Sequence, residues 1–114
     1  MSAETDTEAF QSARSKLIVA PVARLFGAWE DAETRREWLG DDAGIEVREA
    51  NPEHSMRITW IDGETSLSVN FYAKGRAKSQ VQVIHEGLPD RAAVERMKAY
   101  WGERLERLRE LLER

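Results

Sequence analysis

The sequence predicts an α+β fold in which a curved, shortened antiparallel sheet of about five strands wraps a long C-terminal helix, with two short helices after the first strand. Two observations predict this class. Between residues 44 and 86, apolar and polar side chains alternate in segments joined by turn sequences, which is typical of hairpin-linked strands with one covered face. The last 25 residues are highly charged but carry one apolar stripe, which is typical of a helix packed on that face.

The first strand and the two short helices are predicted between residues 12 and 40. The segment SARSKLIVA (12–20) ends in β-branched and apolar residues, as a strand does, and Pro21 suits the first position of a helix. The apolar residues that follow repeat at helical spacing: Val22, Leu25, Phe26 and Trp29. A second helix, AETRREWL, is predicted between an N-cap at Asp31 and a C-cap at Gly40.

Four strands are then predicted from alternation. They are GIEVREA (44–50), SMRITWI (55–61), TSLSVNFY (65–72) and KSQVQVIHE (78–86). The Asp62-Gly63 pair between the second and third of these segments indicates a tight hairpin. A turn containing Lys74 and Gly75 leads into the last strand.

The terminal helix is predicted to start at Asp90, an N-cap that follows Pro89. Its apolar stripe is Val94, Met97, Trp101, Leu105, Leu108 and Leu112. Trp101 lies near the middle of this stripe, and Gly102 beside it suggests a close approach to the sheet. The four tryptophans fall in four different segments, so the fold is expected to bring their rings together.

Length and composition limit the organisation of the protein. A chain of 114 residues suits a single domain, and we expect residues 1–10 to form a disordered acidic tail and residues 11–114 to form the domain. Without cysteine, disulfides and thiolate chemistry are excluded. The net charge of −4 argues against nucleic-acid binding, and no apolar run reaches the roughly 20 residues of a membrane span. We expect a soluble cytoplasmic protein, as a monomer or a homodimer.

Three stretches of the chain together resemble a known superfamily. They are APVARLFGAWEDAETRREWL (20–39), ITWIDGETSLSVNFYAKGRAKSQVQVIHEGLPD (58–90) and AYWGERLERLRELLE (99–113). Their order, with the Trp38-Leu39 ending of the first and the Trp101…Leu105…Leu108…Leu112 spacing of the last, resembles the helix-grip superfamily (START-like, SRPBCC or Bet v 1-like). Within it, the chain is similar to bacterial members related to the activator of heat-shock protein 90 ATPase.

The resemblance implies a START-like domain over residues 11–114 and two kinds of function. One is binding of an apolar small molecule in a cavity between the sheet and the terminal helix. The other, found in some relatives, is contact with the heat-shock chaperone. The chain departs from the family in having four predicted strands between the small helices and the terminal helix, where members typically have six. A narrower sheet wraps less, so the cavity is expected to be reduced to a crevice or filled.

Ten residues are candidates for lining such a cavity: Met56, Ile58, Trp60, Val69, Phe71, Val81, Val83, His85, Met97 and Trp101. Aromatic and methionine side chains make adaptable apolar pockets, but the same side chains can fill one another's space as a core. His85 shares its face with Val81 and Val83, so it either contacts a polar group of a ligand or is satisfied by a hydrogen bond at the end of the sheet. No cofactor is expected, and one inward histidine without thiols predicts no metal site.

Three apolar residues are predicted on the opposite, solvent-facing side of the sheet. They are candidates for binding a partner protein or a second copy of the chain: Ile61, Tyr72 and Ile84. Scattered exposed apolar residues are also common on surfaces that bind nothing. The carboxylates of Asp41 and Asp42 lie together in a glycine-flanked loop, where solvation is a simpler role than acid–base catalysis.

No catalytic motif is recognisable in the chain, which lacks a nucleophile elbow, a phosphate-binding loop and a zinc-protease motif. The leading hypothesis is therefore a non-catalytic domain that binds a small apolar ligand between the sheet and the terminal helix. The alternative is a co-chaperone-like protein-interaction module. An enzyme would need a polar group with a perturbed pKa in the pocket, and only His85 is placed to supply one.

Overall fold

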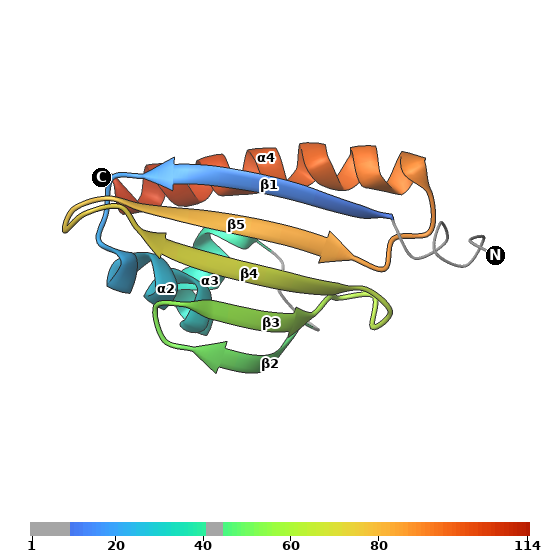
Figure 1. Ribbon diagram of the computed structural model, residues 1–114, viewed down its shortest axis with the longest axis horizontal. Coiled ribbons are helices and arrows are strands. Elements are labelled where there is room, and N and C mark those ends of the chain that lie inside the picture. Colours follow the sequence, from blue (N-terminus) through green and yellow to red (C-terminus); the bar gives the residue numbers. More distant parts are fainter. Residues whose placement is uncertain (1–9, 41–44) are drawn as a thin grey trace.

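The computed structural model describes residues 10–40 and 45–114. Within these ranges, one five-stranded sheet and three helices form an α+β helix-grip fold (Figure 1). The elements in chain order are β1 (Gln11–Ile18), α2 (Val22–Glu30), α3 (Ala32–Leu39), β2 (Glu46–Asn51), β3 (Ser55–Thr59), β4 (Ser66–Ala73), β5 (Ser79–Glu86) and α4 (Arg91–Leu112). The predicted fold class is therefore confirmed.

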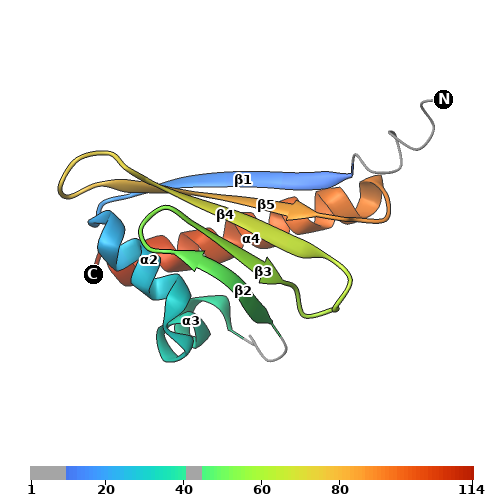
Figure 2. The same cartoon turned by 60° about the horizontal axis from the view of Figure 1, so that its bottom comes forward.

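The strands are arranged in the order β1-β5-β4-β3-β2, and every neighbouring pair is antiparallel. The first strand thus pairs with the last. Helix α4 runs along β1, while α2 packs against β4 and β5 (Figures 1 and 2). The alternation in β4 and β5 turns one face toward these helices, and the side chains on that face are buried.

The helix ends follow the predicted caps, with one difference at α2. Asp31 Oδ2 accepts a hydrogen bond from Thr34 N (2.9 Å), and Asp90 Oδ1 accepts one from Ala93 N (2.8 Å). Gly40 ends α3 with a φ of 87°, a conformation that glycine adopts without a steric penalty. Pro21 is the N-cap of α2 and not its first helical residue.

The connection between β3 and β4 is longer than the two-residue turn that the sequence indicates, because β3 ends at Thr59 and β4 begins at Ser66. The carboxylate of Asp62 holds this loop together, since its Oδ1 accepts hydrogen bonds from the backbone N–H groups of Glu64 and Thr65 (both 2.8 Å). A side chain that caps backbone N–H groups in this way competes with a tight turn. The loop therefore places Thr65 at the end of the sheet.

The core between sheet and helices contains all four tryptophans, as expected. The Trp101 ring lies 5.3 Å from that of Trp60 and 6.0 Å from that of Trp29, and Trp29 in turn lies 4.8 Å from Trp38. The indole N–H of Trp38 donates to Ala28 O (2.9 Å). These rings are supplied by α2, α3, α4 and the end of β3, so they join the sheet and helices into one packed cluster.

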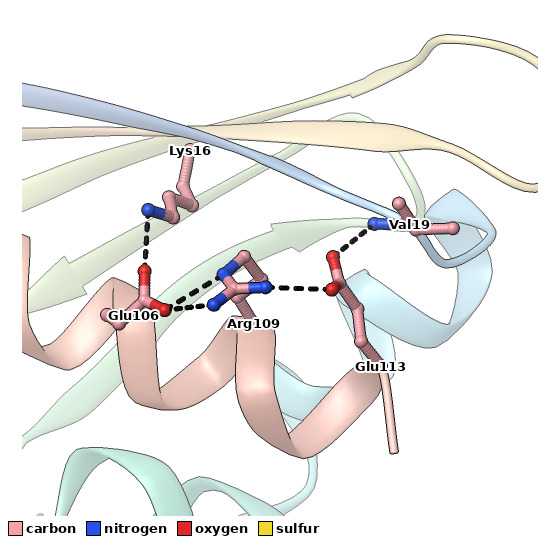
Figure 3. Close-up of polar contacts among 5 residues, drawn as sticks. All are labelled: Lys16, Val19, Glu106, Arg109 and Glu113. Atoms are coloured by element: carbon pink, nitrogen blue, oxygen red, sulfur yellow. Dashed lines mark hydrogen bonds and ion pairs between the residues drawn. The ribbon is translucent and has the colours of Figure 1, made fainter.

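The contact between β1 and the C-terminal half of α4 is polar (Figure 3). Glu106 accepts from Lys16 Nζ (2.7 Å) and from the guanidinium of Arg109, which also donates to Glu113 Oε1 (2.9 Å). Hydrogen bonds from Arg109 and Lys16 lower the pKa of Glu106 to about 2. The second oxygen of Glu113 accepts from the backbone N–H of Val19 (2.8 Å). This network fixes the end of β1 to the end of α4.

Gly102 provides the close approach that its position suggests. A Cβ atom at this position would lie 2.6 Å from Nη2 of Arg14, a β1 side chain that rests on the helix at that point. The Arg14 guanidinium also donates from Nη1 to Lys98 O (3.1 Å). A side chain at position 102 would therefore displace the guanidinium.

Two predicted features fall wholly or mostly outside the described residues. They are the Asp41–Asp42 carboxylate pair and the acidic tail of residues 1–10, of which only Phe10 is described; its carbonyl accepts from Leu88 N (3.2 Å). No helix in the described part of the chain is long and apolar enough to cross a membrane.

Candidate functional site

A crevice of about 240 Å³ lies where the β3–β4 loop, the end of β5 and the first turns of α4 meet. Its apolar lining is provided by Trp60, Leu88, Pro89, Ala93 and Met97, and its polar lining by Asp62, Glu64, Thr65, His85 and Arg96. Pockets for drug-sized ligands begin at about 300 Å³. The crevice is therefore sized for a smaller molecule.

The sequence builds this crevice through the sharp change of direction after β5. Gly87 follows the strand with a φ of +83°, and its Cα faces the backbone of Thr65, so that an added Cβ would be 3.8 Å from Thr65 Cα. Glycine is suited to this left-handed conformation. The chain then passes through Leu88 to the N-cap of α4 at Asp90, which aims the first turns of the helix along the crevice wall.

A chain of buried hydrogen bonds forms the floor of the crevice. The indole N–H of Trp101 donates to His85 Nδ1 (3.2 Å), and His85 Nε2 lies 2.9 Å from Thr65 Oγ1. Because an indole N–H can only donate, Nδ1 must be unprotonated, and the ring proton is on Nε2. Nε2–H therefore donates to Thr65 Oγ1, whose hydroxyl donates to the Asp62 carboxylate (2.9 Å).

The burial of His85 determines its protonation. Desolvation lowers the pKa of His85 from 6.5 to about 4, and the negative charge of Asp62 opposes this only in part. Burial alone would raise the pKa of Asp62, but the hydrogen bonds from Thr65 and Glu64 outweigh it and hold that pKa below its ordinary value. At neutral pH the floor therefore consists of a neutral imidazole and an ionised carboxylate.

This arrangement limits the chemistry that the crevice can perform. Both ring nitrogens of His85 are engaged, so the ring offers an incoming molecule neither a free donor nor a free acceptor. Among the residues that the structure describes, no group of three or more histidines or carboxylates could hold a metal ion. The polar groups that remain for a ligand are the exposed side chains of Asp62, at the end of this hydrogen-bond chain, and of Glu64 and Arg96.

The structure brings three of the ten candidate cavity residues to the crevice, namely Trp60, His85 and Met97. The other seven are buried in the packed core: Met56, Ile58, Val69, Phe71, Val81, Val83 and Trp101. Phe71 contacts the rings of Phe26 and Trp29 (5.2 and 6.2 Å). Alternation assigns a residue to the inner face, but it does not distinguish a residue that lines a void from one that fills the core.

Sequence reasoning missed several residues of the crevice. Thr65 continues the inward alternation of Leu67 and Val69, so this signal was present in the sequence. The Asp62-Gly63 pair in the sequence indicates only a turn and gives no sign that the Asp62 carboxylate reaches the crevice. Three of the other missed residues, Leu88, Ala93 and Arg96, reach the crevice only because the chain turns sharply between β5 and α4.

The three candidate partner-binding residues lie apart on the protein. The side chains of Ile61 and Tyr72 are exposed (41% and 43%), and that of Ile84 is half-buried. Tyr72 pairs with Gln80, four residues along β5 from Ile84, which corresponds to about 13 Å of strand. Ile61 belongs to the β3–β4 loop, toward the other end of the sheet.

Comparison with known proteins places the chain in a family. The model of the family described as Activator of Hsp90 ATPase homolog 1-like protein matches residues 39–113, about two thirds of the chain. The chain belongs to this family. The matched part includes β2 to β5 and α4, and so all of the residues that line the crevice. No curated protein matches the chain in sequence.

Solved structures of low sequence identity share the fold. A protein from Mesorhizobium loti has a TM-score of 0.77 and 18% identity, covering 91% of this chain and 97% of its own. An HSP90 activator from Plasmodium falciparum has a TM-score of 0.76 and 16% identity, covering 92% and 97%. The Aha1 dimer from Colwellia psychrerythraea has a TM-score of 0.75 and 14% identity, covering 91% and 96%. At these identities the likeness shows the fold alone.

Proposed function

We propose that the chain is a non-catalytic domain that binds a small apolar molecule in the crevice between the sheet and the C-terminal helix. The observation that carries this proposal is the open space between Trp60, Leu88 and Met97, above a floor whose polar groups already have partners. An apolar molecule placed there removes apolar surface from water without leaving His85 unsatisfied. Each 100 Å² of apolar surface buried in this way contributes about 2.5 kcal/mol before the cost of association.

The filled core limits the size of the ligand. The four tryptophan rings occupy the region between sheet and helix that larger members of the superfamily are expected to leave open. A ligand is thus confined to about 240 Å³ at the end of the sheet. A polar group on the ligand would face the exposed side chains of Asp62 or Arg96. These features favour a small aromatic or short aliphatic compound over a sterol.

A titration followed by amide NMR tests this proposal, with indole, phenol and hexanoate as probes and a sterol as the size control. We expect the small probes to shift the amides of Trp60, Thr65 and Leu88, and the sterol to shift none. The variant Ala93→Leu fills the crevice and should abolish the shifts. The matched control Ala99→Leu lies on the exposed side of the same helix and should retain them. The proposal is wrong if no probe shifts these amides at about 5 mM.

A second candidate function is a co-chaperone-like interaction module. The specific observation that favours it is the filled core, which leaves this chain less room for a ligand than an open helix-grip cavity would. The structural likeness to an HSP90 activator is consistent with it. Calorimetry with a bacterial heat-shock protein 90, together with its ATPase rate, tests this candidate directly. An unchanged ATPase rate and no heat of binding at about 100 μM would eliminate it.

A further inference from the structure

The turn between β4 and β5 is a concentrated positive charge on an otherwise acidic protein. Its sequence, KGRAK (74–78), has three cations and no acid, while the whole chain has a net charge of −4. Lys74, Arg76 and Lys78 are all exposed, and none has an ion pair with any residue that the structure describes. The turn projects at the opposite end of the molecule from the crevice (Figure 1).

Strand register places apolar side chains directly behind this turn. Leu17 of β1 and Tyr72 of β4 both pair with Gln80 of β5, so the three form one row on the outer face. The next row on the same face lies closer to the turn, two residues further along each strand. It contains Val19, which follows Leu17 by two residues, and also Lys78 and Lys74. The last two are joined by a hydrogen bond from Lys74 N to Lys78 O (2.9 Å).

Six residues thus make up a surface that we call the terminal patch: Leu17, Val19, Tyr72, Lys74, Arg76 and Lys78. Five large apolar side chains are exposed on the described part of the chain, and three of them belong to this patch. Leu17 is 50% exposed, Val19 55% and Tyr72 43%. Apolar groups clustered beside cations mark an interaction site more often than scattered ones do.

The backbone beneath the terminal patch is fixed. The N–H of Val19 donates to Glu113, and the buried hydroxyl of Ser79 donates to Ala20 O (2.7 Å). The Lys74 ammonium lies 5.9 Å from the Tyr72 ring centroid, which keeps the cation beside the apolar row. A patch held in this way loses little conformational freedom when a partner binds.

A row of neutral side chains on the outer face borders the terminal patch. The next row away from the terminal patch is neutral and consists of Ser15, Gln82 and Asn70. Glu113, an acid that contacts the backbone of the patch, is already paired with Arg109 and with the Val19 N–H. The positive field of the three cations is therefore left to attract an external anion.

We propose that the terminal patch docks an acidic segment of a partner protein that carries a large apolar side chain. The carboxylates of the segment lie over Lys74 and Lys78, and its apolar side chain packs on Leu17, Val19 and Tyr72. This proposal does not rest on a ligand in the crevice or on a chaperone as the partner. It identifies the partner only by its chemistry.

The shape of the terminal patch favours a protein segment over a membrane or a nucleic acid. The apolar side chains lie on the face of the sheet, and the tip itself carries only alanine, glycine and the cations. Nothing large and apolar is thus placed to enter a bilayer ahead of the cations. Three cations also neutralise fewer phosphates than the six to ten contacts of a typical nucleic-acid complex.

An amide NMR titration tests the proposal with a ten-residue peptide of seven acidic residues, two leucines and one phenylalanine. Its counterpart has amides in place of the carboxylates. We expect the acidic peptide to shift amides between residues 17 and 19 and between 72 and 78, and the neutral peptide to shift none. The double variant Lys74→Gln/Lys78→Gln should weaken binding about fivefold. The control Arg91→Gln/Lys98→Gln makes the same change in net charge on α4 and should weaken it less than twofold.

The apolar half of the terminal patch has its own test. Leu17→Ser should weaken the acidic peptide about threefold while the protein keeps its melting temperature, because this side chain is half exposed. The proposal is overturned if the neutral peptide binds equally, or if the shifts fall elsewhere. It is also overturned if the acidic peptide does not bind while phosphatidylglycerol vesicles or a single-stranded oligonucleotide do.

Discussion

Protonation of His85 should destabilise the protein at mildly acidic pH. The ring is 1% exposed, and its Nδ1 accepts the indole N–H of Trp101, so a second ring proton must break that bond. The pKa of His85 is lowered to about 4 in the folded protein, whereas in the unfolded chain it is near 6.5. Between these two values the unfolded chain binds more protons than the folded protein, so stability falls as the pH falls through this window.

The size of this effect follows from the two pKa values. A pKa difference of one unit corresponds to about 1.4 kcal/mol of stability. Protonation of His85 can therefore lower the free energy of unfolding by at most about 3 kcal/mol, of which about 2 kcal/mol is lost by pH 4.5. The paired carboxylates of Asp62 and Glu106 change the stability mainly at lower pH. Because their pKa values are depressed in the folded protein, their contributions to the free energy of unfolding are kept above the ordinary carboxyl pKa. The interval from pH 6.5 to 4.5 therefore isolates the histidine.

Urea unfolding between pH 7.5 and 4.5 measures the effect in the wild-type protein and in two variants. His85→Gln should lower the stability at pH 7 and flatten the pH dependence. His54→Gln removes an exposed histidine from the β2–β3 connection and should leave the dependence unchanged. If the free energy of unfolding of the wild-type protein stays constant over this interval, the buried hydrogen-bond chain is wrongly assigned.

Other residues give predictions of defined size. Trp101→Ala should lower the free energy of unfolding by about 3–5 kcal/mol in urea melts, since it opens the centre of the tryptophan cluster; a loss below 1 kcal/mol would mean that Trp101 is not core. Asp90→Ala removes the side-chain cap of α4 and should cost about 1 kcal/mol by the same assay, with Asp90→Asn nearly neutral as its control. The pKa of Glu106 is about 2, below the ordinary 4.5, so its contribution is present above pH 4.5 and is lost as the pH falls toward 2. Glu106→Gln should therefore make the melting temperature depend less on pH in that range, whereas a dependence equal to that of the wild-type protein would contradict the Lys16–Glu106–Arg109 network.

Local patterns predicted the elements well because their causes are local. The caps at Asp31 and Asp90 and the inward face of β5 follow from neighbouring residues alone. The chain through His85 depends on Thr65 and Trp101, which are 20 and 16 residues away in sequence, and their meeting requires the complete fold. Alternation therefore placed His85 on the inner face but could not show that both of its nitrogens are occupied.

The size of the crevice could not be predicted from the sequence, for a different reason. A void is the difference between the space that the backbone encloses and the volume that side chains fill. Trp29 of α2 and Trp38 of α3 fill the centre, because α2 packs against β4 and β5 and α3 packs on α2 and α4. The outer face shows a similar limit of alternation, which predicts the face of a residue but not its neighbours on that face. Alternation grouped Tyr72 with Ile84, whereas the strand register places Tyr72 in a row with Leu17.

In the structure the crevice is open, whereas the tryptophan core is closed. The four indole N–H signals in an NMR spectrum test this arrangement most directly, because two of these rings adjoin the crevice and two lie away from it. On titration with indole or phenol, we predict shifts of the signals of Trp60, which lines the crevice, and Trp101, which donates to His85. The signals of Trp29 and Trp38 should stay fixed. Movement of all four signals would show that the ligand enters the core, and movement of none would show that the crevice is closed; either result would contradict the account.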